Sequence, residues 1–134
     1  MRQFNQIEIG MSGQISKFVT EQDIVAFSEI TGDKNAIHLD PNFAAGTIFG
    51  KRISHGMLIA SFISTVFGSH FPGDGWIYVN QTLNFKAPVF IGDLVDVCVT
   101  VKKLLPKKKM VQFETVASVE KKIVVSGSAT LLGP

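Results

Sequence analysis

Residues 56–68 read Gly-Met-Leu-Ile-Ala-Ser-Phe-Ile-Ser-Thr-Val-Phe-Gly and hold the longest apolar run of the chain. Apolar side chains would surround nearly the whole circumference of a helix built from this run, and such a helix is buried on all sides. The run is too short to cross a bilayer, which takes about 20 apolar residues. In a chain of 134 residues, the simplest way to bury this helix is to wrap a sheet around it.

The second half of the chain supplies that sheet. Apolar and polar residues alternate in four segments, which is the pattern of strands with one buried face. The predicted strands occupy residues 76–86, 95–101, 111–119 and 123–132. The connections between them are 87–93, 106–109 and 120–122. Short turns between consecutive strands predict an antiparallel meander.

The first half adds one strand and two helices. Residues 12–19 alternate loosely and predict the first strand. Thr20 has the side chain of an N-cap, and Gly32 is placed to end the helix that follows. Asp40 and Pro41 form a second helix start, because aspartate caps well and proline suits the first helical position. The polar segment between the two helices is expected to be a loop.

The predicted fold class is therefore α+β, with one long helix packed on one face of a curved antiparallel sheet. We expect residues 1–134 to form a single domain, since no linker or repeat interrupts them. An apolar content of 46% is enough for one sizeable core. The charged content of 18% lies below the usual value of about a quarter, which points weakly to surface hidden in an oligomer.

The net charge and the cysteine content indicate which classes of partner and which cellular compartment to expect. The net charge is +2 without an obvious basic face, so nucleic-acid binding is not expected. Cys98 is the single cysteine, and its place in an apolar run predicts a small buried hydrophobe rather than a redox thiol. No apolar signal core follows Met1. We expect a soluble protein in a reducing, cytoplasmic setting with no membrane partner.

Asp33 and His38 form the one acid–imidazole pair in a single loop near a helix end. A carboxylate and an imidazole together can hold a water molecule and move protons in both directions, as the hydration of a double bond requires. Histidine suits this work because its pKa lies near neutrality. The spacing alone also fits a structural interpretation, in which Asp33 forms a turn and His38 packs.

Gly56 opens the buried helix, where free N–H groups and the positive end of the helix dipole can bind a carbonyl oxygen. The alternative is that glycine merely permits tight packing between helix and sheet. The neighbouring His55 is expected to be structural, and His70 is expected to cap the helix or lie on the surface. The three histidines have no partners at metal-ligand spacing, so no metal site is predicted.

Several lysines are candidates for contact with a phosphorylated carrier. Residues 102–103 and 107–109 are basic, but their position around a turn favours simple solvated charges. Lys51 and Arg52 lie closer to Gly56 in the sequence and are better placed for that role.

Three segments together resemble one known family. Residues 31–38, Thr-Gly-Asp-Lys-Asn-Ala-Ile-His, resemble the Ser/Thr-Gly-Asp-x-Asn-Pro-x-His signature of the MaoC-like dehydratases, the group of R-specific enoyl-CoA hydratases. Residues 54–58, Ser-His-Gly-Met-Leu, are similar to the family's landmark at the start of the central helix. Residues 84–93, Asn-Phe-Lys-Ala-Pro-Val-Phe-Ile-Gly-Asp, are similar to its strand and turn. The resemblance spans nearly the whole chain.

The resemblance implies a hot-dog fold and a homodimer, or a dimer of dimers, with an acyl tunnel near the subunit interface. Asp33 and His38 match the catalytic pair that positions and activates water. Asn35 and Gly56 are the implied substrate-binding positions: Asn35 matches the asparagine that supports the loop, and the Gly56 N–H matches the donor to the thioester carbonyl. Ala36 departs from the family's proline, which puts the rigidity of the loop in question.

The expected activity is that of a hydro-lyase without a cofactor, an R-specific 2-enoyl-CoA hydratase that forms an R-3-hydroxyacyl thioester. A 3-hydroxyacyl-[acyl-carrier-protein] dehydratase of fatty-acid synthesis would use the same residues, with acyl carrier protein as the partner. A hot-dog thioesterase is disfavoured, because residues 57–68 contain no Asp or Glu. A non-catalytic acyl-thioester binding module has no need for the catalytic pair. Chain length, carrier, direction and pathway stay open.

Overall fold

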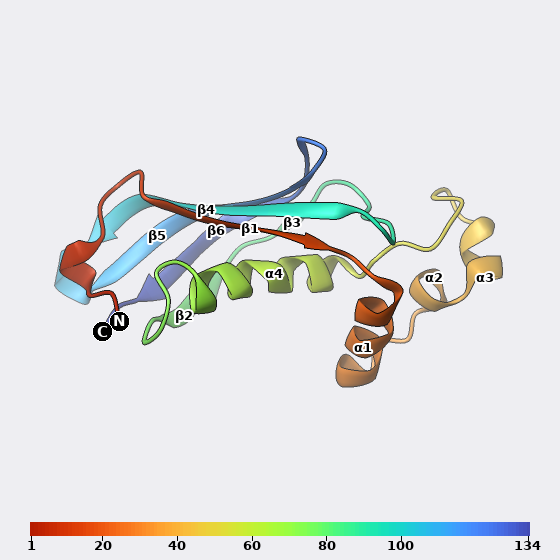
Figure 1. Cartoon of the computed structure of the whole chain (residues 1–134), viewed down its shortest axis with the longest axis horizontal. Helices are drawn as coiled ribbons and strands as arrows, with labels where there is room; N and C mark the ends of the chain where they lie inside the picture. The colour runs from red at the N-terminus through yellow and green to blue at the C-terminus, as the bar shows by residue number, and fades with distance from the viewer.

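A six-stranded antiparallel sheet carries the longest helix, α4, across one of its faces (Figure 1). The computed structural model describes residues 1–134. The strands are β1 (Ser12–Phe18), β2 (Ile77–Gln81), β3 (Asn84–Phe85), β4 (Leu94–Leu105), β5 (Met110–Val119) and β6 (Lys122–Leu132). The helices are α1 (Glu21–Thr31), α2 (Ala36–Leu39), α3 (Pro41–Ala45) and α4 (Gly56–Ser69), with 3-10 turns at Phe4–Gln6 and Pro106–Lys108. The predicted α+β class is confirmed.

The core lies between α4 and the inner face of the sheet. Every second residue of β4 from Val95 to Val101 is fully buried there. Each valine removed from water in this way contributes about 1.5–3 kcal/mol to folding, which explains why this strand holds the helix. None of the four α-helices combines the length and the apolar content that a membrane span requires.

The prediction that α4 is buried on all sides is wrong for the isolated chain. Met57 is 55% exposed, and Ser61 and Ser64 on the same face are also exposed. These positions recur at i, i+4 and i+7, which places them on one face of the helix. The sequence prediction treated Ser61 and Ser64 as part of an apolar run, although a serine side chain can also face water. One stripe of α4 is therefore left uncovered by its own sheet.

The strands follow the order β1-β4-β5-β6-β2, and β3 also pairs with β6. The predicted meander is confirmed for β4, β5 and β6, whose turns are tight enough to need positive φ angles at Lys109, Glu120 and Lys121. It is wrong for residues 76–86, which pair with β6 at the far edge rather than with β4. The longer connection after β3 allows the chain to cross over to β4, which lies between β1 and β5.

Residues 76–86 also do not form one strand, because the chain breaks between β2 and β3. Gln81 fills the break by donating from Nε2 to the carbonyl of Thr82 at 2.8 Å and to Thr115 Oγ1 at 2.9 Å. Gly127 on β6 faces the break, and a Cβ at this position would lie 1.8 Å from the Thr82 oxygen. A glycine is therefore required where the broken strand presses against the sheet.

Helices α1, α2 and α3 lie beyond one end of the sheet, next to the start of α4 (Figure 1). The predicted caps are confirmed. Thr20 Oγ1 accepts from the Asp23 N–H at 3.1 Å, and Gly32 ends α1 with a φ of 79°. Asp40 Oδ1 accepts two N–H groups at the start of α3, which has Pro41 as its first residue. This end of the molecule carries the residues of interest for function.

Cys98 departs from its predicted burial. It is half-buried on β4, between the fully buried Val97 and Val99, because successive side chains of a strand point to opposite faces. Its Sγ lies 3.8 Å from Thr100 Oγ1 on the same outer face. The thiol therefore packs on the outside of the sheet and not in the core.

Candidate active site

The segment between α1 and α2 is shaped by its own polar side chains. Thr31 Oγ1 accepts from the Asp33 N–H at 3.1 Å, and Asp33 Oδ1 accepts from the Asn35 N–H at 3.2 Å. Asn35 Oδ1 accepts from the Ile37 N–H at 3.1 Å and so caps α2. Asn35 is thus placed to support the loop. Ala36 is the first residue of α2, a position that proline also suits.

The expectation that this polar segment is entirely loop is wrong, since His38 lies on the single turn of α2. Its side chain is 9% exposed, and its Nδ1 lies 2.8 Å from the carbonyl oxygen of Ile53. A carbonyl only accepts, so Nδ1 carries the proton. The Nε2 atom then has no proton and carries a lone pair that can accept one. His38 is therefore held in the tautomer that can accept a proton.

Arg52 fastens the backbone of His38 to α1. Its Nε donates to the His38 carbonyl at 2.6 Å, while Nη1 and Nη2 donate to Glu21 at 2.8 and 3.0 Å. The Arg52 side chain is only 13% exposed, and a two-pronged pair with a carboxylate fixes direction as well as distance. Sequence reasoning placed Arg52 with a phosphorylated carrier, but its guanidinium is occupied within the fold.

Asp33, His38 and His55 come together from three different segments. Each offers a ligand or proton-transfer atom, and these atoms lie within 4.8 Å of one another. Asp33 is exposed, whereas the two histidines are buried. A carboxylate open to water beside a buried imidazole is an arrangement that can hold a water molecule and exchange protons with it. The absence of a metal site stays a prediction.

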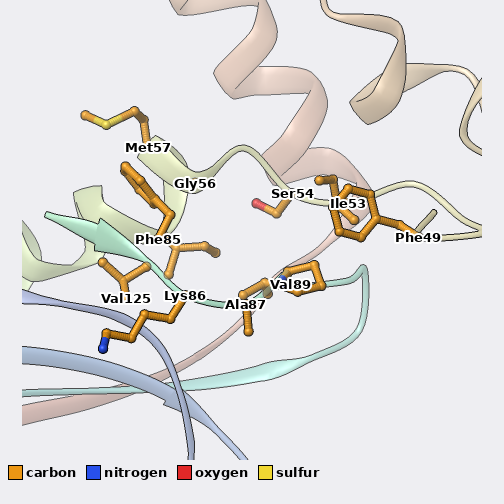
Figure 2. A pocket seen from close by; sticks show the side chains of 12 residues that line it. Phe49, Ile53, Ser54, Gly56, Met57, Phe85, Lys86, Ala87, Val89 and Val125 are labelled. Atoms are coloured by element: carbon orange, nitrogen blue, oxygen red, sulfur yellow. The ribbon is translucent and has the colours of Figure 1, made fainter. Parts of the chain in front are cut away.

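The N-terminus of α4 borders a cavity of about 410 Å³ (Figure 2). The N–H groups of Gly56 and Met57 have no acceptor within the chain, as expected for the first turn of a helix. In Figure 2 the Phe85 ring lies beside Gly56 and Met57. The lining also includes Phe49, Ile53, Ser54, Ile59, Lys86, Ala87, Pro88, Val89 and Val125. The cavity is mostly apolar and lies in the range of about 300–1,000 Å³ that suits small ligands.

Neither Asp33 nor His38 lines this cavity. The segment from Ile53 to Gly56 belongs to both places, because the Ile53 carbonyl binds His38 and the Gly56 backbone faces the cavity. His38 therefore contacts one end of this short segment, and the predicted carbonyl donor lies at the other end.

Cations near the cavity differ from those expected. Lys86 lines the cavity, although sequence reasoning did not single it out. Lys51 instead lies with its Nζ 4.4 Å from the centre of the Phe90 ring, next to a second cavity of about 350 Å³. Lys51 was predicted to contact a phosphorylated carrier because it lies close to Gly56 in the sequence. Lys86 is 30 residues from Gly56 in the sequence (86 − 56), so only the fold brings it to the same cavity.

Comparison with known protein families assigns the chain to one of them. A family model described as a MaoC like domain matches residues 4–125. The chain belongs to the MaoC-like family. An (R)-specific enoyl-CoA hydratase of Rhodospirillum rubrum is 47% identical to it over 131 residues, which cover 98% of this chain and 91% of the relative. A 3-hydroxybutyryl-CoA dehydratase of Methylorubrum extorquens is 44% identical over 131 residues, with 98% and 83% covered.

A solved structure shows the same architecture. The (R)-hydratase from A. caviae involved in PHA biosynthesis matches this MaoC-like chain with a TM-score of 0.93 and 39% identity. The match covers 96% of this chain and 98% of that one. The hot-dog fold that the sequence resemblance implied is therefore confirmed for this MaoC-like protein, and so is membership of the family.

Proposed function

We propose that this protein is an R-specific 2-enoyl-CoA hydratase, which adds water reversibly to a trans-2-enoyl thioester and forms an R-3-hydroxyacyl thioester. The observation that carries the proposal is the meeting of Asp33 and His38 beside the uncapped start of α4. Relatives that are 47% and 44% identical bear the names of such hydro-lyases.

The thioester carbonyl would bind at the Gly56 N–H. Two observations support this placement: the N–H has no acceptor within the chain, and the adjoining cavity is apolar enough for an acyl or pantetheine arm. Glycine leaves the backbone open to close approach. A donor at this point, aided by the helix dipole, polarises the carbonyl and makes C3 of the enoyl group electrophilic.

Asp33 and His38 then bind the water molecule and transfer its proton. Asp33 is an acceptor through its carboxylate, and His38 is an acceptor through Nε2, so one water molecule can donate a hydrogen bond to each. One O–H bond of the water breaks as its oxygen bonds to C3, and the pair takes up that proton. A proton returns from the pair to C2 on the same side of the double bond. Every atom of water ends in the product, and no cofactor takes part.

We infer further that residues 1–134 act as one catalytic domain and assemble as a homodimer, or as a dimer of dimers. The edge strand β2 supports this, because Ile77 is 59% and Val79 49% exposed on it. Unpaired apolar edges pair readily with another chain. Ile77→Lys should shift the protein toward monomer in light scattering, whereas Ile30→Lys, at an 84% exposed site on α1, should not. A dimer that survives Ile77→Lys would place the interface elsewhere.

The decisive assay is hydration of crotonyl-CoA, followed as loss of the enoyl-thioester absorbance. Asp33→Asn and His38→Gln should each lower turnover by about 10²–10⁴-fold, the usual contribution of a proton-transfer group. Asp74→Asn and His70→Gln make the same chemical changes at exposed positions outside the site and should leave turnover unchanged. Near-normal turnover in both Asp33→Asn and His38→Gln would refute the assignment.

Two further measurements refine the substrate. Turnover on enoyl-CoA and on the same acyl group carried by acyl carrier protein would separate the hydratase from a carrier-protein dehydratase. Coupling the product to a dehydrogenase specific for R- or S-3-hydroxyacyl-CoA would report the configuration at C3. If the protein binds both thioesters but turns over neither, it is a non-catalytic binding module. The cytoplasmic setting stays a prediction.

A further inference from the structure

His55 was expected to be a structural residue at the start of α4. It occupies the N-cap position, yet its side chain makes no capping hydrogen bond. The ring is 2% exposed and turns toward α1 and the α1–α2 segment. Its Nε2 lies 3.1 Å from Ser28 Oγ and 3.2 Å from the carbonyl oxygen of Asp33. The ring therefore connects the start of α4 with the backbone of the predicted catalytic acid.

The partners of the ring determine its protonation. The Asp33 carbonyl only accepts, so Nε2 of His55 carries the proton. The other nitrogen, Nδ1, is buried and has no hydrogen-bond partner. A proton on Nδ1 would be buried without an acceptor, which is unfavourable. Burial accordingly lowers the pKa of His55, and this effect outweighs the hydrogen bond to the Asp33 carbonyl, which raises the pKa. The charge of the neighbouring His38 adds a smaller lowering effect.

The neutral ring of His55 also supports the ring of His38. The two ring centres are 3.9 Å apart, and the planes are inclined by 32°. Phe27 packs on His55 as well, with 4.8 Å between ring centres. Two charged imidazoles at this separation would repel each other. A His55 that stays neutral therefore leaves the single positive charge of the pair to His38.

We propose that His55 is a positioning residue for the hydration reaction: its Nε2–H holds the Asp33 backbone while its ring face fixes the orientation of His38. The inference rests on the proposed function of Asp33 and His38. The charged groups around the pair are Asp33 on the α1–α2 segment and the Arg52–Glu21 ion pair behind the His38 carbonyl. The His55 side chain is not part of the cavity lining, and its contacts are with Asp33, Ser28, Phe27 and His38, so it acts through the two predicted catalytic residues.

The chain offers a matched pair of variants at this position. In His55→Gln the amide nitrogen reaches about as far as Nε2 and can still donate to the Asp33 carbonyl. In His55→Asn the same amide is one methylene shorter and reaches only as far as the unpaired Nδ1. His55→Gln should stay within about tenfold of wild-type kcat, whereas His55→Asn should fall by about 100-fold, the effect of a misplacement of about 1 Å. KM should change by less than about threefold in both, because substrate contacts are intact.

The outcome is decided by kcat on crotonyl-CoA, with near-UV circular dichroism to confirm the fold. Equal kcat for His55→Gln and His55→Asn, both near wild type, would overturn the proposal. Where a variant fails to fold, ¹⁵N NMR of the wild-type histidines gives an independent answer. The proposal requires His55 protonated on Nε2 and His38 on Nδ1, and the opposite tautomer of His55 would overturn it. A wild type that is inactive on every enoyl thioester would count against the proposed function alone, because the NMR result does not depend on turnover.

Discussion

Replacing Gly56 by alanine tests the proposed carbonyl site directly. A Cβ added at this position would lie 2.6 Å from Cδ1 and 2.8 Å from Cε1 of Phe85. Carbon atoms pack best at about 3.5–4.0 Å, so the overlap is about 1 Å. Phe85 is 54% exposed, and its ring can turn aside into solvent. We therefore expect the free energy of unfolding to fall by about 1 kcal/mol, the lower end of the usual cost of overpacking.

The effect on activity should be much larger than the effect on stability. The methyl group would occupy the space through which a carbonyl approaches the Gly56 N–H. Loss of one oxyanion donor lowers kcat by about 10²–10³-fold, or about 2.7–4 kcal/mol. We expect a decrease of this size in kcat on crotonyl-CoA, with the melting temperature lowered by only a few degrees for a domain of this size.

A second variant separates the two causes. In the double variant Gly56→Ala, Phe85→Ala the ring is gone, so any loss due to its displacement should be recovered. A loss due to the methyl group itself should persist, and this is the outcome we expect. Wild-type kcat/KM in a folded Gly56→Ala protein would refute the placement of the carbonyl at this N–H.

Three other predictions concern His55 and Arg52 at the site and Tyr78 on β2. Burial holds the pKa of His55 below 6.5. Below pH 6.5 the unfolded chain therefore binds a proton at His55 more readily than the folded chain does. The contribution of His55 to the free energy of unfolding is complete above pH 6.5 and declines as the pH falls below it. Urea titrations should show a decline of at most about 1.4 kcal/mol per pH unit from this group, and His55→Gln should remove it. Arg52→Met should lower the free energy of unfolding by about 2–3 kcal/mol, since charged hydrogen bonds to Glu21 and to the His38 carbonyl are lost. Glu21→Gln should cost less, because Arg52 keeps the bond to His38; equal losses would contradict this account. Burial raises the pKa of Tyr78, the single tyrosine, to about 12. At pH 10.5 the absorbance of tyrosinate should therefore be absent in the folded protein and present in the protein unfolded in guanidinium. Ionisation with a pKa near 10 in both states would contradict the structure.

The local signals in the sequence were sufficient for most of the fold. The helix at 56–68, the strands after residue 93 and the caps at Thr20 and Asp40 all agree with the structure. Periodicity and capping depend on residues within about one helical turn or along one strand, so the sequence alone carries them. The one-turn helix α2 was missed because four residues are too few to show a period.

The break between β2 and β3, and the crossing of the chain to the far edge of the sheet, were not predictable in this way. Apolar residues occupy every second position from Ile77 to Phe85 except at Gln81, and a single polar residue in the apolar register does not by itself indicate a break. The break depends on Gln81 finding Thr115 and on Gly127 giving room to Thr82, which are contacts between distant parts of the chain. A pattern within one segment contains no information about such partners.

The same division applies to the site. The sequence by itself determined which chemistry is available: the carboxylate of Asp33, the imidazole of His38 and the open backbone at Gly56, together with a family resemblance that ties them to thioester hydration. Only the tertiary structure decided the tautomer of His38, the hydrogen bonds of Arg52 within the fold and the place of His55 against the predicted catalytic pair. The hydrogen bonds of His55 join residues 22 and 27 positions apart. Separations of that size are closed by the packing of helices against a sheet, and that packing depends on the whole core rather than on any one stretch of residues.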